Sequence, residues 1–182
     1  MFFSRLTLLN KLLEDGNTLY RKHKLVEASH RYSYANKKVP SENQGSHQKV
    51  FDQLKTHLLI NLSRCKRKMK DHSEAVRLAG EVVRLRPHCY QAYHARAQAN
   101  HAAGNLHAAL TDLTEAVRVA PQNRELHKIL LNLKDEIESK SSPLPDSAFE
   151  ESRDGSHDST SGVGSSAEGS TKDYDPDAIL ML

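Results

Sequence analysis

The chain has 182 residues, of which 37% are hydrophobic, and it contains no tryptophan. These values favour one domain built as a thin, alanine-rich helical array with a tail, and they argue against a large enzyme core. Residues 141–182 hold nine acidic and two basic residues, a net charge of −7, whereas the whole chain carries +3. Residues 1–140 therefore carry +10, which favours acidic partners, and the chain's own tail is one candidate.

The first predicted element is a pair of helices that ends at a proline. Residues from Phe2 to about Lys22 place leucines at helical spacing, and residues from about Val26 to Lys38 continue the pattern. Pro40 ends the second helix because proline lacks an N–H donor and disfavours helix in the residue before it. The first predicted hairpin therefore covers about residues 9–40.

An insertion follows Pro40, over about residues 41–53. Its first half is rich in turn-forming residues, and its second half, from Val50, predicts an extension of the next helix, which should reach Met69. A long helix after such an insertion resembles the second repeat of the large immunophilins.

Two further hairpins are predicted at residues 56–87 and 90–121, and each closes on a proline. Small residues recur where the two helices of a hairpin must cross: Gly16, Ser63 and Ala97 on the first helices, and Ala28, Ala75 and Ala109 on the second. The spacing of Pro87 and Pro121 matches the period of tetratricopeptide arrays. Residues 124–138 predict a capping helix that covers the last hairpin.

The sequence thus predicts an all-α fold: a tetratricopeptide solenoid of three hairpins and a C-terminal capping helix, forming a domain over residues 1–140. Residues 141–182 predict a disordered acidic tail rich in serine and glycine. Cys65 and Cys89 form no CxxC motif and predict reduced packing residues in a cytoplasmic protein. No apolar run is long enough for a membrane span, so any association with membranes would come through partners.

No phosphate loop, HExxH, GxSxG or paired-carboxylate motif is present, so we expect a non-enzymatic interaction module without a cofactor. His94 and His101 lie on one predicted helix but lack a third clustered ligand, so no metal site is predicted. The basic run at residues 64–70 suits a helix C-terminus, where cations complement the dipole. Nucleic-acid binding through this run is the alternative, and the lack of interleaved aromatic residues argues against it.

In such arrays the first helix of each hairpin lines a concave groove. The residues predicted by register to face this groove are polar and largely cationic: Asn17, Tyr20, Arg21, Asn61, Arg64, Arg67, Lys68, His94, Gln98 and His101. We expect the groove to capture an extended acidic peptide. Arg64, Arg67 and Lys68 would supply charge, while Asn17 and Asn61 would hold backbone amides. The alternative is that these residues form solvated helix faces.

A second function of the same class is the cochaperone. Cochaperone arrays hold the acidic C-termini of heat-shock chaperones with asparagines on the first and second repeats and cations on the first and third. Asn17 and Asn61 match the asparagines, but Leu13, Gln91 and Ala95 stand where the cations should be. Because charged donors make the stronger hydrogen bonds to a carboxylate, their loss argues against this clamp.

Residues 58–99 and 110–130 resemble the repeat block of the TANC and rolling pebbles scaffolds, and the resemblance extends over about residues 10–137. It implies a scaffold or adaptor that assembles partners at synaptic membranes or at sites of myoblast fusion. The ankyrin repeats of that family have no counterpart here, since no T-P-L-H signature occurs. Leu180, Met181 and Leu182 also fit a C-terminal ligand that adds to a partner's sheet as a strand, although an arbitrary chain end is the alternative.

Overall fold

The structure is a computed structural model, and it describes residues 2–40 and 47–141. These residues form seven helices: α1 (Phe2–Arg21), α2 (Leu25–Lys38), α3 (Gln48–Lys68), α4 (His72–Leu85), α5 (Tyr90–Ala102), α6 (Leu106–Val119) and α7 (Arg124–Ser141). The turn-rich half of the insertion and residues 142–182 of the predicted tail lie outside the described residues, whereas Ser141 belongs to α7, which extends beyond the predicted end at residue 138. The long helix predicted after the insertion is α3, which begins slightly earlier than expected, at Gln48 and not at Val50.

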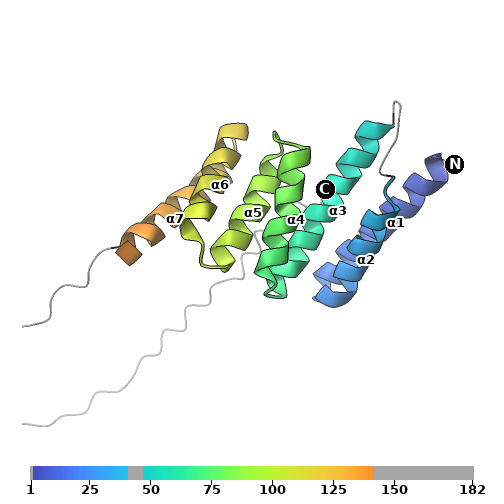
Figure 1. Cartoon of the computed structure of the whole chain (residues 1–182), viewed down its shortest axis with the longest axis horizontal. Helices are drawn as coiled ribbons and strands as arrows, with labels where there is room; N and C mark the ends of the chain where they lie inside the picture. Colours follow the sequence, from blue (N-terminus) through green and yellow to red (C-terminus); the bar gives the residue numbers. More distant parts are fainter. Residues whose placement is uncertain (1, 41–46, 142–182) are drawn as a thin grey trace, which may run out of the picture.

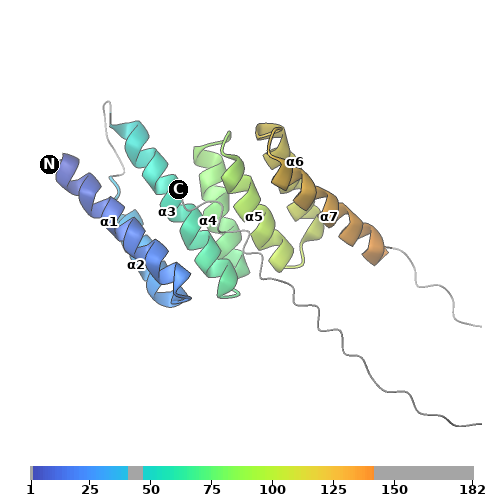
Figure 2. The same ribbon diagram turned by 180° about the vertical axis from the view of Figure 1, so that it is seen from behind.

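Consecutive helices pair as hairpins, α1 with α2, α3 with α4 and α5 with α6, and α7 packs on α6 (Figure 1). The view from behind shows α1, α3, α5 and α7 side by side along one face of the array (Figure 2). We call this surface the A face. The other helices, α2, α4 and α6, form the opposite face (Figure 1). The predicted all-α array of three hairpins and a capping helix is confirmed.

Each hairpin turns through one residue in the left-handed backbone region: His23 (φ 57°), Lys70 (φ 64°) and Gly104 (φ 81°). The amide of the residue after each of these donates to the carbonyl five positions earlier, at 3.0, 2.9 and 2.8 Å in turn. This is the Schellman arrangement that commonly ends a helix. The spacing from Lys70 to Gly104 equals the repeat period, whereas the spacing from His23 to Lys70 is longer by the length of the insertion.

The predicted crossing points are buried. Ala28, Ala75 and Ala109 are completely inaccessible to solvent. Ser63 is also buried, and its hydroxyl donates a hydrogen bond of 2.8 Å to the carbonyl oxygen of Ala75. Small side chains at these points allow the two helices of a hairpin to approach closely, as the sequence predicts.

Gly16 is the most demanding crossing point. A Cβ atom at this position would lie 2.5 Å from Cε1 of the Tyr32 ring. Tyr32 cannot easily move aside, because its side chain is 1% exposed and its hydroxyl is hydrogen-bonded to Asn17. The ring therefore requires glycine on the facing helix.

We expect Gly16→Ala to lower the free energy of unfolding by about 1–2 kcal/mol, measured by urea denaturation, because overpacking outweighs the gain in helix propensity. Overpacking costs about 1–3 kcal/mol, and alanine in a helix recovers up to about 1 kcal/mol. Gly80→Ala in α4 is the matched control, because the nearest atoms to its new Cβ are 3.8 Å away. It should raise the free energy of unfolding by about 0.5–1 kcal/mol. If both substitutions changed the free energy of unfolding in the same direction, the close approach of Tyr32 to Gly16 would be contradicted.

Candidate functional site

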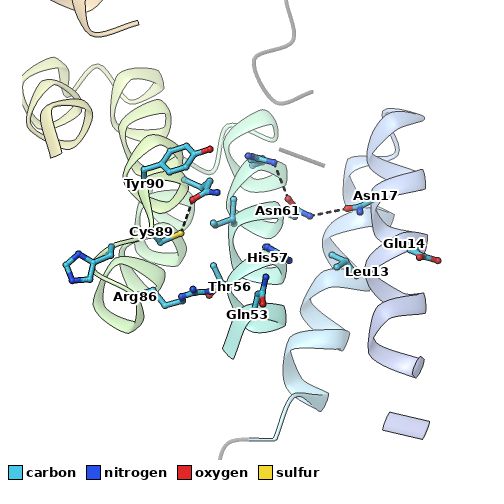
Figure 3. Close-up of a pocket in the computed structure, with 14 residues that line it drawn as sticks. Leu13, Glu14, Asn17, Gln53, Thr56, His57, Asn61, Arg86, Cys89 and Tyr90 are labelled. Carbon is cyan, nitrogen blue, oxygen red and sulfur yellow. Dashed lines mark hydrogen bonds between the residues drawn. The ribbon is translucent and has the colours of Figure 1, made fainter. Parts of the chain in front are cut away.

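A pocket of about 490 Å³ opens on the A face between α1, α3 and the start of α5 (Figure 3). We call it the basic pocket. α3 contributes Gln53, His57, Asn61 and Arg64, whose spacing of three or four positions places them on one side of the helix. Thr56 and Ile60 of α3 also line the pocket, and the other lining residues come from α1, from the segment between α4 and α5, and from α5. They include Leu13, Glu14, Asn17, Arg86, His88, Cys89, Tyr90 and Gln91.

A chain of hydrogen bonds organises the wall of this pocket and joins three helices. Nη1 of Arg64 donates to Oδ1 of Asn61 at 3.2 Å, and Nδ2 of Asn61 donates to Oδ1 of Asn17 at 3.0 Å (Figure 3). The same oxygen of Asn17 accepts a 2.7 Å hydrogen bond from the Tyr32 hydroxyl. Burial raises the pKa of Tyr32, so its hydroxyl remains a donor at neutral pH. The asparagines are thus held in place before any ligand arrives.

The pocket carries positive charge. Arg64 and Arg86 line it, and Glu14 is the acidic residue among its lining residues. The pKa of His57 is lowered by burial and, secondarily, by the charges of Arg86 and Arg64. His57 is therefore neutral at pH 7, and the two arginines set the local potential, which favours an anionic ligand.

A second pocket of about 380 Å³ lies on the A face where α5, α6 and α7 meet. We call it the apolar pocket. Ala97, Leu113, Ile129 and Leu133 provide its apolar surface, and the polar residues around them include Arg67, His94, Gln98, His101 and Glu136.

A hydrogen bond connects two helices at the rim of the apolar pocket. Nε2 of His101 on α5 lies 2.7 Å from Oε2 of Glu136 on α7. Lys140 lies 2.7 Å from the other carboxylate oxygen. Hydrogen bonds from Lys140 and His101 hold the pKa of Glu136 at about 2. The carboxylate thus stays charged and helps to keep α7 on the array.

The structure divides the predicted groove residues into three groups. Asn17, Asn61 and Arg64 line the basic pocket, whereas Arg67, His94, Gln98 and His101 line the apolar pocket. Neither pocket's lining includes the remaining three, which are Tyr20, Arg21 and Lys68.

These three residues make other contacts. Tyr20 is buried, and the Lys68 ammonium lies 4.8 Å from the centroid of its ring. Arg21 is exposed, and its Nη2 lies 3.4 Å from the Thr18 hydroxyl. Lys68 keeps its positive charge beside the Tyr20 ring, and its expected role in the groove stays a prediction.

His57 and Arg86 are pocket residues that the sequence analysis did not identify. His57 lies one helical turn before Asn61, so the register of α3 contained a signal for it. Arg86 follows the last residue of α4, in the connection to α5. Helical periodicity makes no prediction for such a segment, so only the structure identifies this arginine.

Arg96 lies next to a cation position of the chaperone clamp, but its guanidinium binds within the third hairpin. Its Nη2 lies 2.6 Å from Oδ1 of Asp112, and its Nε lies 3.0 Å from Oδ2. Asn100 donates a further hydrogen bond of 3.1 Å to the same carboxylate, and Asp112 is 4% exposed. Arg96 thus joins α5 to α6 and neutralises a buried carboxylate.

Replacing Arg96 should therefore destabilise the third hairpin. We expect Arg96→Met to lower the free energy of unfolding by about 2–3 kcal/mol, because it leaves Asp112 buried without its cation. The control is Arg118→Met, which removes an exposed arginine paired with Glu115 and should leave stability unchanged. Urea denaturation measures both, and equal effects would show that the Arg96 pair is only a surface contact.

Residues 2–40 and 47–141 contain no group of three histidine, cysteine or acidic side chains that could bind a metal ion. Within the same ranges, no helix has the length and apolar character of a membrane span.

A family model for the tetratricopeptide repeat matches residues 90–123, which cover the third hairpin. The third hairpin thus matches one tetratricopeptide repeat, and the seven helices stack as consecutive hairpins in the same way. Solved tetratricopeptide domains have the same fold. One is the C-terminal domain of a putative FK506-binding protein from Plasmodium falciparum, with a TM-score of 0.62 and 20% identity over 75% of this chain and 92% of that chain.

Two further similar structures come from RPAP3. The first tetratricopeptide domain of human RPAP3 has a TM-score of 0.62 and 21% identity, and the alignment covers 74% of this chain and 96% of that chain. The first tetratricopeptide domain of Spaghetti (RPAP3), bound to the HSP90 peptide SRMEEVD, has a TM-score of 0.59 and 21% identity over 71% and 93% of the two chains. At these identities the similarity shows the fold.

Proposed function

We propose that this tetratricopeptide array is a non-enzymatic protein-binding module that captures an acidic peptide segment in the basic pocket. The observation that carries the proposal is that Arg64 and Arg86 line the same open pocket. The asparagine side chains beside them are held in place by a hydrogen bond. The arginines attract carboxylates, and the asparagine amides suit the backbone of an extended peptide. Because the asparagine side chains are already ordered in the free protein, binding costs little additional side-chain entropy.

The C-terminal peptide of a chaperone is the first candidate ligand. A tetratricopeptide domain of similar fold binds the acidic peptide SRMEEVD, and Asn17 and Asn61 lie together as such a clamp requires. The cations come from other positions, however. Leu13 and Gln91 line the pocket without charge, so Arg64 and Arg86 would take over the role of the absent clamp cations.

A scaffold or adaptor role is the second candidate. It is supported by the resemblance of residues 58–99 and 110–130 to the repeat block of the TANC and rolling pebbles scaffolds. The same pocket would then hold an acidic segment of an assembled partner. Binding of the chaperone peptide separates the two candidates, because a scaffold of this kind has no need to recognise SRMEEVD.

Reversing the charge of Arg86 tests the pocket directly. We expect Arg86→Glu to weaken binding of SRMEEVD about tenfold, measured by calorimetry at low salt. It removes one attraction and adds one repulsion, each worth up to about 1 kcal/mol at an exposed site, and about 1.4 kcal/mol corresponds to tenfold. Arg84→Glu is the matched control, since this exposed arginine lies nearby in the chain and does not line the pocket. The proposal fails if both variants bind as the unaltered chain does.

His57 offers a spectroscopic test of the same proposal. Burial and the two nearby arginines lower its pKa in the free protein. A bound carboxylate would offset those charges, so the pKa of His57 should rise when the peptide binds. Binding then takes up protons, and it tightens as the pH falls toward the pKa of the imidazole in the complex. An NMR titration of the histidine ring protons measures this shift, and the ring signals of exposed His127 on α7 serve as the control, because His127 does not line the pocket.

A further inference from the structure

The two pockets adjoin along the same pair of helices. Arg64 lines the basic pocket and Arg67 the apolar pocket, so α3 passes from one pocket to the other within a single turn. On α5, Gln91 and His94 show the same spacing. Three residues of helix rise about 4.5 Å, whereas one residue of extended peptide spans about 3.3 Å. A short peptide with acidic residues beside apolar ones would therefore reach both pockets.

The chain itself contains a segment of this composition. Residues 173–182 read DYDPDAILML, with three aspartates followed by five apolar residues. The segment lies outside the described residues. It belongs to the part of the chain with a net charge of −7, while residues 1–140 carry +10. Its acids match the basic pocket in charge, and its apolar residues match the surface formed by Leu113, Ile129 and Leu133.

The connection between the array and this segment has the necessary length. Residues 142–172 separate it from the end of α7, and 31 residues at about 3.3 Å each can reach up to about 100 Å. Glu136, at the rim of the apolar pocket, lies in the last turns of α7. The tail therefore leaves the array close to that pocket.

We propose that residues 173–182 bind the A face of their own chain, with the aspartates at the basic pocket and residues 178–182 in the apolar pocket. The inference rests on the proposed capture of acidic peptides by the basic pocket. The segment acts as a built-in competitor, so an external acidic peptide must displace it. The proposal also defines the partner: a segment with acidic residues followed within a few positions by apolar ones.

The test uses the full chain and its amide NMR spectrum. The triple variant D173N/D175N/D177N should shift the amide signals of Asn61 and Gln91 relative to the unaltered chain. The control E150Q/E151Q/D154N changes the charge of the same tail by the same amount and should leave those signals in place. A second variant, L180S/M181S, should shift the signal of Gln98 in the apolar pocket. Unmoved signals in both test variants, or equal shifts in the control, would overturn the proposal.

Dilution separates binding within one chain from binding between two copies. A tenfold dilution should leave the shift differences unchanged, because the segment and its pockets belong to the same molecule. Differences that disappear on dilution would assign the contact to a second copy and would overturn the intramolecular proposal.

Peptide affinity distinguishes this inference from the proposed function. A tethered segment acts at an effective concentration on the order of 1 mM. If its own dissociation constant is about 0.1 mM, SRMEEVD should bind the triple variant about tenfold more tightly than the control. If SRMEEVD bound the triple variant and the control with the same measurable affinity, the tail would not act as a competitor, and the proposed function would stand. Shifts specific to the triple variant without any binding of SRMEEVD would support the tail contact and reject the chaperone-peptide candidate.

Discussion

The close crossing of helices at residues without bulk is the constraint on which the array depends. In the first hairpin, the absence of a side chain at Gly16 makes room for the ring of Tyr32. In the second, the hydroxyl of Ser63 reaches the backbone of Ala75, and in the third two buried alanines share one core cluster. Since each hairpin is narrow at its crossing point, successive hairpins stack with their first helices side by side. The A face and both of its pockets result from that stacking.

The same packing prepares the polar surface of the basic pocket. Tyr32 fills the space opposite Gly16 and directs its hydroxyl to Asn17, which in turn accepts a hydrogen bond from Asn61 on the next hairpin. Core packing and ligand recognition are therefore linked through one tyrosine. A pocket built in this way is ordered by the fold itself, and binding energy is not used to arrange it.

The repeat register predicted most of the fold, because small residues and prolines recur at positions that the packing of two helices dictates. It also placed Asn17 and Asn61 on facing helices. It could not identify Arg86, because this residue lies in the connection between two hairpins and helical periodicity applies only within helices. Nor could it foresee that Arg96 would pair with Asp112 on the following helix, or that Lys68 would lie over the ring of Tyr20. Both depend on tertiary contacts that spacing alone does not encode.

The shared oxygen of Asn17 has a mechanical consequence. It accepts from Tyr32 in its own hairpin and from Asn61 in the next one, so it adds a polar link between two hairpins that already share one hydrophobic core. Any change in the twist between these hairpins must stretch one of its two hydrogen bonds. A molecule that contacts both α1 and α3 would thus restrict the motion of the first hairpin relative to the second. The bound array would then be stiffer than the free one.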